Sequence, residues 1–183
     1  ILNLAFICGE AYPVPAVRGG AIQTLVTALV EQNEDFHLAN IDIYTVQDSL
    51  LEDEISKYKY SNIIQISKKS FENIYDFAFR VIRKISGYRI NSRGTYTNKV
   101  NRYLKNKYYD AIIVETNERM AREIYLMNSS VSLLHVHADF LSINNKNTFD
   151  ILNRYSYVVG ISDYISSKLY TLDSAFKVKT LKN

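Results

Sequence analysis

Short apolar segments alternate along this chain with segments whose apolar residues recur at helical spacing. The segment Asp110–Glu115 is apolar at every position between its two acidic ends, as expected of a central strand in a parallel sheet. The intervening segments place apolar residues three and four positions apart, which is typical of amphipathic helices. Alternating strands and helices favour a parallel sheet covered on both faces. The sequence therefore predicts an α/β fold with a Rossmann-like, doubly wound, mostly parallel sheet of about seven strands and helices on both faces.

The order of elements can be predicted along the whole chain. The predicted strands are 2–8, 41–46, 62–67, 110–115, 131–137, 157–161 and 178–181. The predicted helices follow Gly20 and begin near residues 70, 96, 117, 148 and 162. In the first helix, the residues expected on the buried face are Ile22, Leu25, Val26 and Leu29. In the helix from residue 96, they are Tyr96, Val100, Tyr103 and Leu104.

Composition limits the class of protein. With 183 residues, 47% of them hydrophobic and 22% charged, the chain fits one globular domain spanning residues 1–183. Its apolar runs are far shorter than the ~18–20 residues of a membrane span. The only cysteine, Cys8, follows an apolar run, so we expect a buried core residue rather than a nucleophile. A chain that can form no internal disulfide favours a reducing, cytoplasmic location.

Charge is distributed unevenly along the chain. Residues 68–107 hold eleven basic and two acidic residues, a charge of +9, whereas the other residues hold eleven basic and seventeen acidic, a charge of −6. Such a basic segment favours an anionic partner, and interleaved aromatic residues suit an anionic membrane surface. The predicted surface contacts are Arg80, Arg83, Lys84, Arg89 and Arg93. The alternative is two ordinary surface helices whose apolar faces join the core, and we expect no nucleic-acid partner.

The loop between the first strand and the first helix is a candidate phosphate site. Arg18, Gly19 and Gly20 lead directly into that helix. Glycines allow the backbone to approach a ligand, and a helix N-terminus offers free N–H groups to an anion. The alternative is a plain turn that needs glycine for its backbone. Neither the dinucleotide fingerprint G-x-G-x-x-G nor the P-loop is present, which disfavours NAD and ATP enzymes of those classes.

Two further segments end predicted strands with polar residues. His135 and His137 alternate along one strand and so share a face. Metal binding is disfavoured because Asp139 is their only near partner. We expect His135 to be a hydrogen-bonded core residue and His137 to contact a ligand. Glu115 ends a different strand, where it can accept hydrogen bonds from sugar hydroxyls or act as a base.

Beyond Glu115 the chain continues with Asn117 and Glu118. Helix capping is the favoured interpretation of that pair, since Asn is a good N-cap and an acidic first turn suits the helix dipole.

Four segments together resemble the N-terminal domain of GT-B retaining glycosyltransferases of family 4. Val14-Pro-Ala-Val-Arg-Gly-Gly-Ala-Ile-Gln-Thr is similar to that family's first loop and helix. Leu134-His-Val-His-Ala-Asp139 is similar to its strand that ends in a histidine. Val158-Val-Gly-Ile-Ser-Asp-Tyr-Ile165 and Lys179-Thr-Leu-Lys-Asn183 are similar to its later strand and helix and to the lead-in to the second domain.

The resemblance implies a function. It implies transfer of a sugar from a nucleotide sugar, with retention and without a metal or other cofactor, to a cell-envelope, polysaccharide or lipid-linked acceptor. The family's C-terminal nucleotide-binding domain is not in this sequence, so the isolated domain is expected to be inactive. It further implies a bacterial enzyme of hexosyltransferase type, peripheral on the inner face of the cell membrane. A non-catalytic membrane-surface module and a GT-B nucleotide-sugar epimerase are the alternatives.

The resemblance implies roles for Gly19, Gly20 and His137, and the polar residues at the predicted strand ends complete the set of expected site residues. The loop that approaches the donor diphosphate corresponds to Arg18, Gly19, Gly20 and Gln23. His137 and Glu115 are the expected catalytic residues. The expected acceptor or sugar contacts are Asn117, Asp139 and Ser162.

Overall fold

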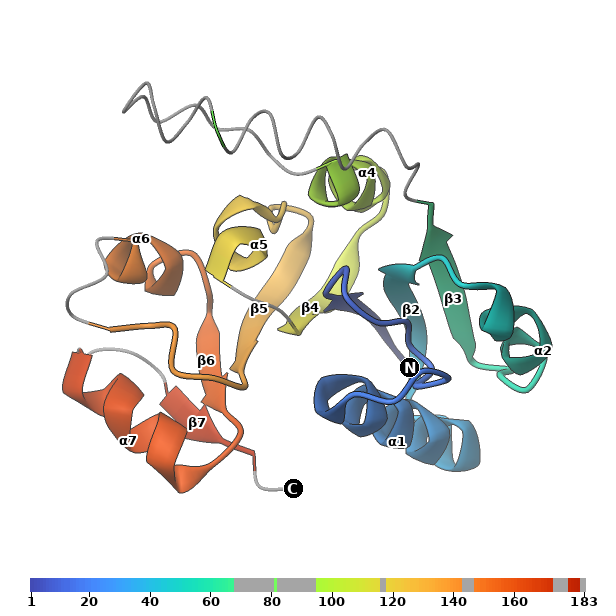
Figure 1. Ribbon diagram of the computed structural model, residues 1–183, viewed down its shortest axis with the longest axis horizontal. Helices are drawn as coiled ribbons and strands as arrows, with labels where there is room; N and C mark the ends of the chain where they lie inside the picture. The colour runs from blue at the N-terminus through green and yellow to red at the C-terminus, as the bar shows by residue number, and fades with distance from the viewer. Residues whose placement is uncertain (68–80, 82–94, 116–117, 143–146, 173–177, 182–183) are drawn as a thin grey trace.

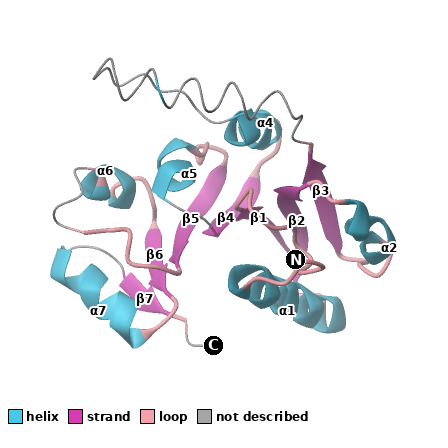
Figure 2. Ribbon diagram, in the orientation of Figure 1, coloured by secondary structure: helices cyan, strands magenta, loops and turns pink. Residues whose placement is uncertain are grey.

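A single parallel sheet organises the chain. The computed structural model describes residues 1–67, 81, 95–115, 118–142, 147–172 and 178–181. Within these residues the strands are β1 (Leu2–Cys8), β2 (Ala39–Val46), β3 (Ser61–Ile66), β4 (Tyr109–Glu115), β5 (Ser129–Val136), β6 (Tyr157–Gly160) and β7 (Val178–Thr180). They pair in the order β3-β2-β1-β4-β5-β6-β7, and every pairing is parallel (Figures 1 and 2). The predicted doubly wound α/β fold is confirmed.

Helices cover the sheet from both sides. The helical segments are α1 (Ala21–Phe36), η1 (Ser49–Leu51), α2 (Glu52–Ile55), α4 (Thr95–Leu104), α5 (Glu118–Glu123), α6 (Thr148–Leu152) and α7 (Asp163–Leu172). Helix α1 lies on one side of the sheet, and α4, α5 and α6 lie on the other (Figure 1). None of these helices is both long and apolar enough to cross a membrane.

Two apolar clusters, one on each face, hold these layers together. On one face Cys8 and Ile43 of the sheet pack with Val26 and Val30 of α1. On the other face Ile7, Val114 and Leu134 pack with residues of α4, α5 and α6. Successive residues of a strand point to opposite faces of the sheet, so a single strand contributes side chains to both clusters. This alternation places Cys8 on the α1 side and its neighbour Ile7 on the opposite side.

Every predicted strand end lies within two residues of the observed end. The predicted buried faces of two helices are partly wrong. In α1 Leu29 is exposed, whereas Gln23 is buried along with Val26, Val30 and Asn33. The buried face of α1 is therefore rotated around the helix axis relative to the predicted one. The side-chain amide of Asn33 donates a hydrogen bond to the carbonyl oxygen of Ala39 and accepts one from the backbone N–H of Ala39, both at 2.9 Å.

In α4 the predicted residue Tyr103 is half exposed, while Tyr96, Val100 and Leu104 are buried as predicted. The Tyr96 hydroxyl lies 3.0 Å from the carbonyl oxygen of Cys8 and so ties α4 to the end of β1. The short helical segment after β2, Ser49–Ile55, was not predicted. The helix predicted from residue 70 lies outside the described residues.

Candidate functional site

The centre of the sheet is a topological switch point. Strands β2 and β3 extend from one side of β1, and β4 to β7 extend from the other. The helices that follow β1 and β4 therefore leave toward opposite faces, as α1 and α5 do (Figure 1). In open α/β sheets such a divergence opens a crevice at the carboxyl ends of the two strands, which is where ligands bind. In this chain Cys8 at the end of β1 and Glu115 at the end of β4 are register partners, so the loop after Cys8 begins next to Glu115. We call this strand-end region of the sheet the crevice.

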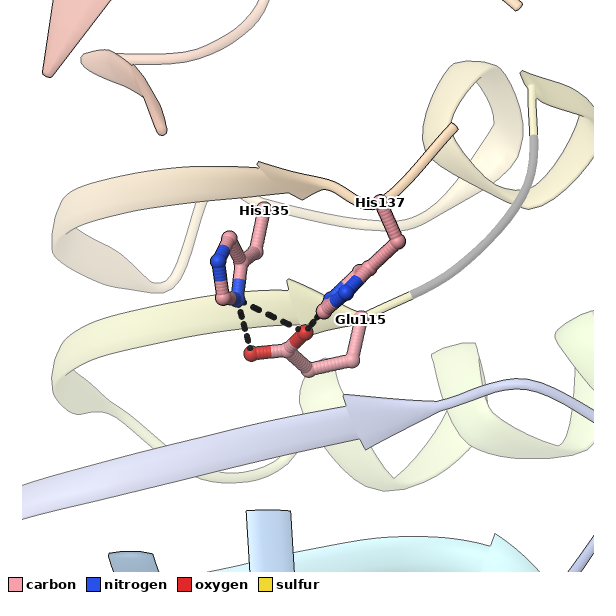
Figure 3. Close-up of side chains that lie close together, drawn as sticks. All are labelled: Glu115, His135 and His137. Atoms are coloured by element: carbon pink, nitrogen blue, oxygen red, sulfur yellow. Dashed lines mark hydrogen bonds and ion pairs between the residues drawn. The ribbon is translucent and has the colours of Figure 1, made fainter. Parts of the chain in front are cut away.

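A buried cluster of three polar side chains lies at this edge. Glu115 at the end of β4 is the register partner of His135 in β5, and His137 follows two residues later on the same side. The Nδ1 atom of His135 is 3.0 Å from each carboxylate oxygen of Glu115 (Figure 3). The Nε2 atom of His137 is 2.5 Å from Oε2 of the same carboxylate. The two imidazole rings lie 4.2 Å apart between centroids.

The cluster is nearly inaccessible to solvent. The side chains of Glu115, His135 and His137 expose 1%, 3% and 8% of their surface. Burial alone would raise the pKa of the Glu115 carboxyl, but the hydrogen bonds from His135 and His137, with the charges those rings can carry, outweigh it and hold the pKa below its usual value. Glu115 is therefore an ionised carboxylate at neutral pH.

Cys8 adjoins the cluster from β1. Burial raises the pKa of its thiol well above the usual value, and the charge of Glu115 raises it further. The thiol is fully buried and stays protonated, and only a thiolate is a strong nucleophile. The prediction that Cys8 is a buried core residue is confirmed.

The second predicted part of the site is the loop that enters α1. Gly19 and Gly20 have φ angles of 73° and 100°, in the left-handed region that favours glycine. A Cβ atom on Gly20 would lie 2.3 Å from Oε1 of Gln23, so the buried Gln23 side chain occupies the space beside it. Gly20 caps the helix without a side-chain hydrogen bond, the first turn holds no acidic residue, and both glycines are exposed. These features suit an anion.

Arg18 already has a charged partner. Its guanidinium forms an ion pair with Asp48, which follows β2. The hydrogen bond and charge of Asp48 raise the pKa of Arg18, and Arg18 in turn lowers the pKa of Asp48. The pair anchors the loop to the neighbouring strand end, and the Arg18 side chain remains half exposed.

Two of the three predicted sugar or acceptor contacts, Asp139 and Ser162, have partners within the described residues. Asp139 forms an ion pair with Lys168 of α7. Ser162 Oγ accepts a hydrogen bond from the backbone N–H of Ile165 at 3.3 Å and so caps the N-terminus of α7. Asn117 lies outside the described residues, as do the five predicted surface contacts Arg80, Arg83, Lys84, Arg89 and Arg93.

Among the described residues, the group able to offer three ligand atoms to a metal ion is Glu115, His135 and His137, whose ligand atoms lie within 4.8 Å of one another. Two histidines and a glutamate form a donor set found around catalytic zinc. Ligating histidines almost always donate their second ring N–H to a partner. Within the part of the chain that the structure describes, Nε2 of His135 and Nδ1 of His137 have no such partner. The donor set fits a metal, but the surroundings of the two rings do not.

Sequence reasoning placed His135 in the core but did not connect it with Glu115. The signal was present, because consecutive strands joined by one helix are usually neighbours in a parallel sheet. Glu115 and His135 end two such strands.

Another polar group, also not predicted, lies on the α4 side of the sheet. The buried Asp42 accepts hydrogen bonds from Tyr109 at 2.5 Å and Lys107 at 2.6 Å. Asp42 also lines a cavity of about 630 Å³ beside α4. Its carboxylate is already satisfied, and it lies along the face of β2 rather than at the strand ends, so we assign it a structural role.

No protein-family model matches the chain, and no curated protein matches it in sequence. Solved structures match it in fold. A glycosyltransferase from Rickettsia africae is 14% identical with a TM-score of 0.53, and the match covers all of this chain and 43% of that one. The N-terminal domain of Candida albicans trehalose-6-phosphate phosphatase is 12% identical with a TM-score of 0.53, covering 98% and 49%. Arabidopsis thaliana UGT89C1, solved with UDP, is 10% identical with a TM-score of 0.50, covering 98% and 48%. The chain thus spans less than half the length of each, and likeness at this identity shows a shared fold.

Proposed function

We propose that this chain is the acceptor-side domain of a retaining glycosyltransferase that moves a sugar from a nucleotide sugar to a cell-envelope, polysaccharide or lipid-linked acceptor. The observation that carries the proposal is the pairing of Cys8 with Glu115 at the switch point. The loop that leads to the glycines therefore begins at the edge of the sheet where Glu115 ends its strand. The fold shared with a glycosyltransferase and with a UDP-bound enzyme supports this assignment.

The loop side of the crevice would hold the diphosphate. Exposed glycines without side chains let phosphate oxygens approach the backbone, and the N-terminus of α1 adds its dipole. Negative charge grows on the leaving diphosphate as the glycosidic bond breaks. Fixed N–H groups aimed at that charge stabilise the transition state more than the ground state.

The Glu115–His137 side of the crevice would orient the sugar. Glu115 accepts the hydrogen bond from Nε2 of His137 and so fixes the ring of His137 just beyond the carboxyl end of β5. A fixed ring holds a hydroxyl in one geometry, which lowers the entropic part of the barrier. The ionised Glu115 also places negative charge near a sugar carbon that becomes positive in transfer.

A second domain would complete the site. The chain spans less than half of the enzymes whose fold it shares. We expect residues 1–183 alone to bind an acceptor at most and not to turn over. No metal or cofactor has a part in this proposal.

The test is a transfer assay on the full-length protein that contains this chain, with a panel of nucleotide sugars and saccharide or lipid-linked acceptors. Gly20→Val should abolish transfer, because a β-branched residue cannot adopt a φ of 100° and its Cβ would collide with Gln23. His37→Asn is the matched control, since His37 ends α1 at its far end and Asn tolerates the φ of 44° found there. Normal transfer by Gly20→Val would refute the role of the loop.

A nucleotide-sugar epimerase built on the same fold makes a different product. It would isomerise the free donor with no acceptor present. If the nucleotide sugar is converted to an isomer of the same mass in a reaction without acceptor, this alternative would replace the transferase proposal.

A further inference from the structure

Another cavity lies at the opposite edge of the sheet from the crevice. Its volume is about 610 Å³, and it is lined by Lys105, by Arg154 and by residues 122–127, which end α5 and lead into β5. These residues meet β5 at its amino end, whereas His137 follows the carboxyl end of that strand. The eight residues of β5 span about 25 Å, so this cavity is distinct from the crevice.

The wall of this cavity is held in place by side chains of neighbouring elements. The buried Asn101 of α4 donates from Nδ2 to the carbonyl oxygen of Glu123 at 3.0 Å and accepts at Oδ1 from the backbone N–H of Tyr125 at 2.7 Å. The guanidinium of Arg154, which follows α6, donates to the carbonyl oxygen of Ile124. A wall that is fixed in this way loses less conformational entropy when a ligand binds.

Positive charge dominates the cavity. Three cationic side chains line it, Lys105 after α4, Arg122 in α5 and Arg154 after α6. The lining carboxylate of Glu123 lies 3.4 Å from Arg122 and 3.9 Å from a fourth cation, Arg119. These five groups carry four positive charges and one negative charge. A concave site lined by charges of one sign concentrates the field and attracts an anion.

The other part of the lining is apolar and aromatic. Tyr125, Leu126 and Met127 line the cavity, and Met127 is 84% exposed. The Nζ atom of Lys105 lies 5.7 Å from the centre of the Tyr125 ring, so the cation lies over an aromatic face. A single exposed apolar residue needs no explanation, but Met127 continues the apolar wall of a cavity that is basic on its other side. An amphiphilic ligand fits both parts.

We propose that this cavity binds an amphiphilic organic phosphate. Its phosphate group lies between Lys105, Arg122 and Arg154, and its apolar chain lies along Leu126 and Met127. A guanidinium offers paired N–H donors that match phosphate oxygens, and a lysine adds a point charge. The volume is in the range of small-molecule sites. A second copy of this chain is a poorer occupant, because it would bring the same positive charges to the contact.

The experiment is isothermal titration of the full-length protein that contains this chain. The probes are dihexanoyl phosphatidylglycerol below its micellar concentration, glycerol 3-phosphate and dihexanoyl phosphatidylcholine. We expect saturable binding of the phosphatidylglycerol, weaker binding of glycerol 3-phosphate, which has no acyl chains, and the weakest binding of the phosphatidylcholine, whose choline offsets the phosphate charge. No saturable binding of the phosphatidylglycerol by the folded protein would overturn the proposal.

Lys105→Gln combined with Arg154→Gln should weaken phosphatidylglycerol binding by about 10²-fold, since each charged hydrogen bond contributes about tenfold. The matched control is Lys57→Gln combined with Lys59→Gln, which removes the same charge from two exposed lysines between α2 and β3. An equal loss in both double variants would mean that only net charge matters and would overturn the site. Because Arg154 also contacts the backbone of Ile124, Lys105→Gln alone is the second variant, with an expected loss of about tenfold.

Met127→Ser separates the apolar contact from the charged one. It should weaken binding of the phosphatidylglycerol by about tenfold and leave glycerol 3-phosphate binding unchanged, because only the acyl chains reach Met127. Leu50→Ser, at another exposed apolar residue, is the control. Unchanged phosphatidylglycerol affinity in Met127→Ser would overturn the apolar half of the site.

Vesicles distinguish the two sources of such a phosphate. Sedimentation with phosphatidylglycerol vesicles that the Lys105→Gln, Arg154→Gln variant loses assigns the ligand to a membrane lipid. Binding of the monomeric probe alone assigns it to a soluble phosphate ester, and both results support the site. These measurements involve no sugar transfer, so the proposed function and this inference fail separately.

Discussion

At the scale of single residues, Glu115 shows what burial does to an acidic group that has partners. Its pKa is lower in the folded chain than in the unfolded chain, because two histidines donate to it and outweigh its desolvation. Such a group adds stability above its unfolded pKa of about 4.3, and that stability is lost as pH falls through the folded pKa.

The free energy of unfolding should therefore decrease as pH is lowered from about 5, and Glu115→Gln should make that decrease shallower. Urea unfolding at a series of pH values measures both slopes. Glu52→Gln, on the exposed face of α2, is the control and should leave the slope as in the wild type. An unchanged slope in Glu115→Gln would contradict the lowered pKa.

The two adjacent glycines should respond unequally to substitution. Gly20→Ala should lower the free energy of unfolding by about 1–3 kcal/mol, because Ala at a φ of 100° is strained and its Cβ would displace Gln23. Gly19→Asn should cost less, because nothing lies within 4 Å of a Cβ there and Asn tolerates a φ of 73°. Equal losses in thermal and urea unfolding would show that Gln23 yields without cost.

Single-residue signals in the sequence located part of the site. The glycine pair, Glu115 and His137 could be singled out from their positions at predicted strand ends. The ion pairs of Arg18 with Asp48 and of Asp139 with Lys168 could not, because they join segments whose side chains meet only after the sheet and its loops have formed. Their partners carry no local pattern.

At the scale of elements, the packing of α7 on β6 depends on a missing side chain. A Cβ on Gly160 would lie 2.4 Å from Oγ of Ser166 and 2.9 Å from its backbone nitrogen. The helix can therefore approach the strand this closely only with glycine at that position. Strand β6 was predicted from the sequence. The contact between Gly160 and Ser166 was not, because it depends on how closely α7 packs against β6.

Gly160→Ala should destabilise the chain by about 1–3 kcal/mol, since the helix backbone must move away from the strand. Ser166→Ala should recover only part of this loss, because it removes Oγ but leaves the backbone nitrogen in place. The double mutant cycle is measured by urea unfolding, with the exposed Ser167→Ala as the matched control. Full recovery would mean that the hydroxyl alone limits the approach.

Elements were predicted more reliably than their orientations. Strands such as β4 are marked by continuous apolar residues, which only a buried parallel strand explains well. The buried face of α1 was misplaced because Gln23 and Asn33 are buried through specific polar and steric partners that helical periodicity does not register.

At the scale of the whole molecule, charge is segregated along the chain. The segment 68–107 holds half of the basic residues but only two of the nineteen acidic ones, and its described part includes the exposed Arg102, Lys105 and Lys107 around the end of α4. We propose that this segment brings the protein to an anionic membrane surface.

The chain should sediment with vesicles that contain anionic phosphatidylserine and not with neutral phosphatidylcholine vesicles, and salt should weaken the binding. Arg80→Gln combined with Arg83→Gln should reduce the bound fraction more than Lys57→Gln combined with Lys59→Gln, two exposed lysines outside the segment. Sedimentation indifferent to both lipid charge and salt would exclude the membrane partner.

The pairing of β1 with β4 also sets an order of events during synthesis. Strands β1, β2 and β3 can associate early, but one edge of β1 must wait for residues 109–115 to leave the ribosome. At about 5–20 residues per second, that edge stays open for several seconds as an unpaired apolar strand, the kind that recruits other chains. The nascent polypeptide therefore needs protection longest at the position where its crevice will later form.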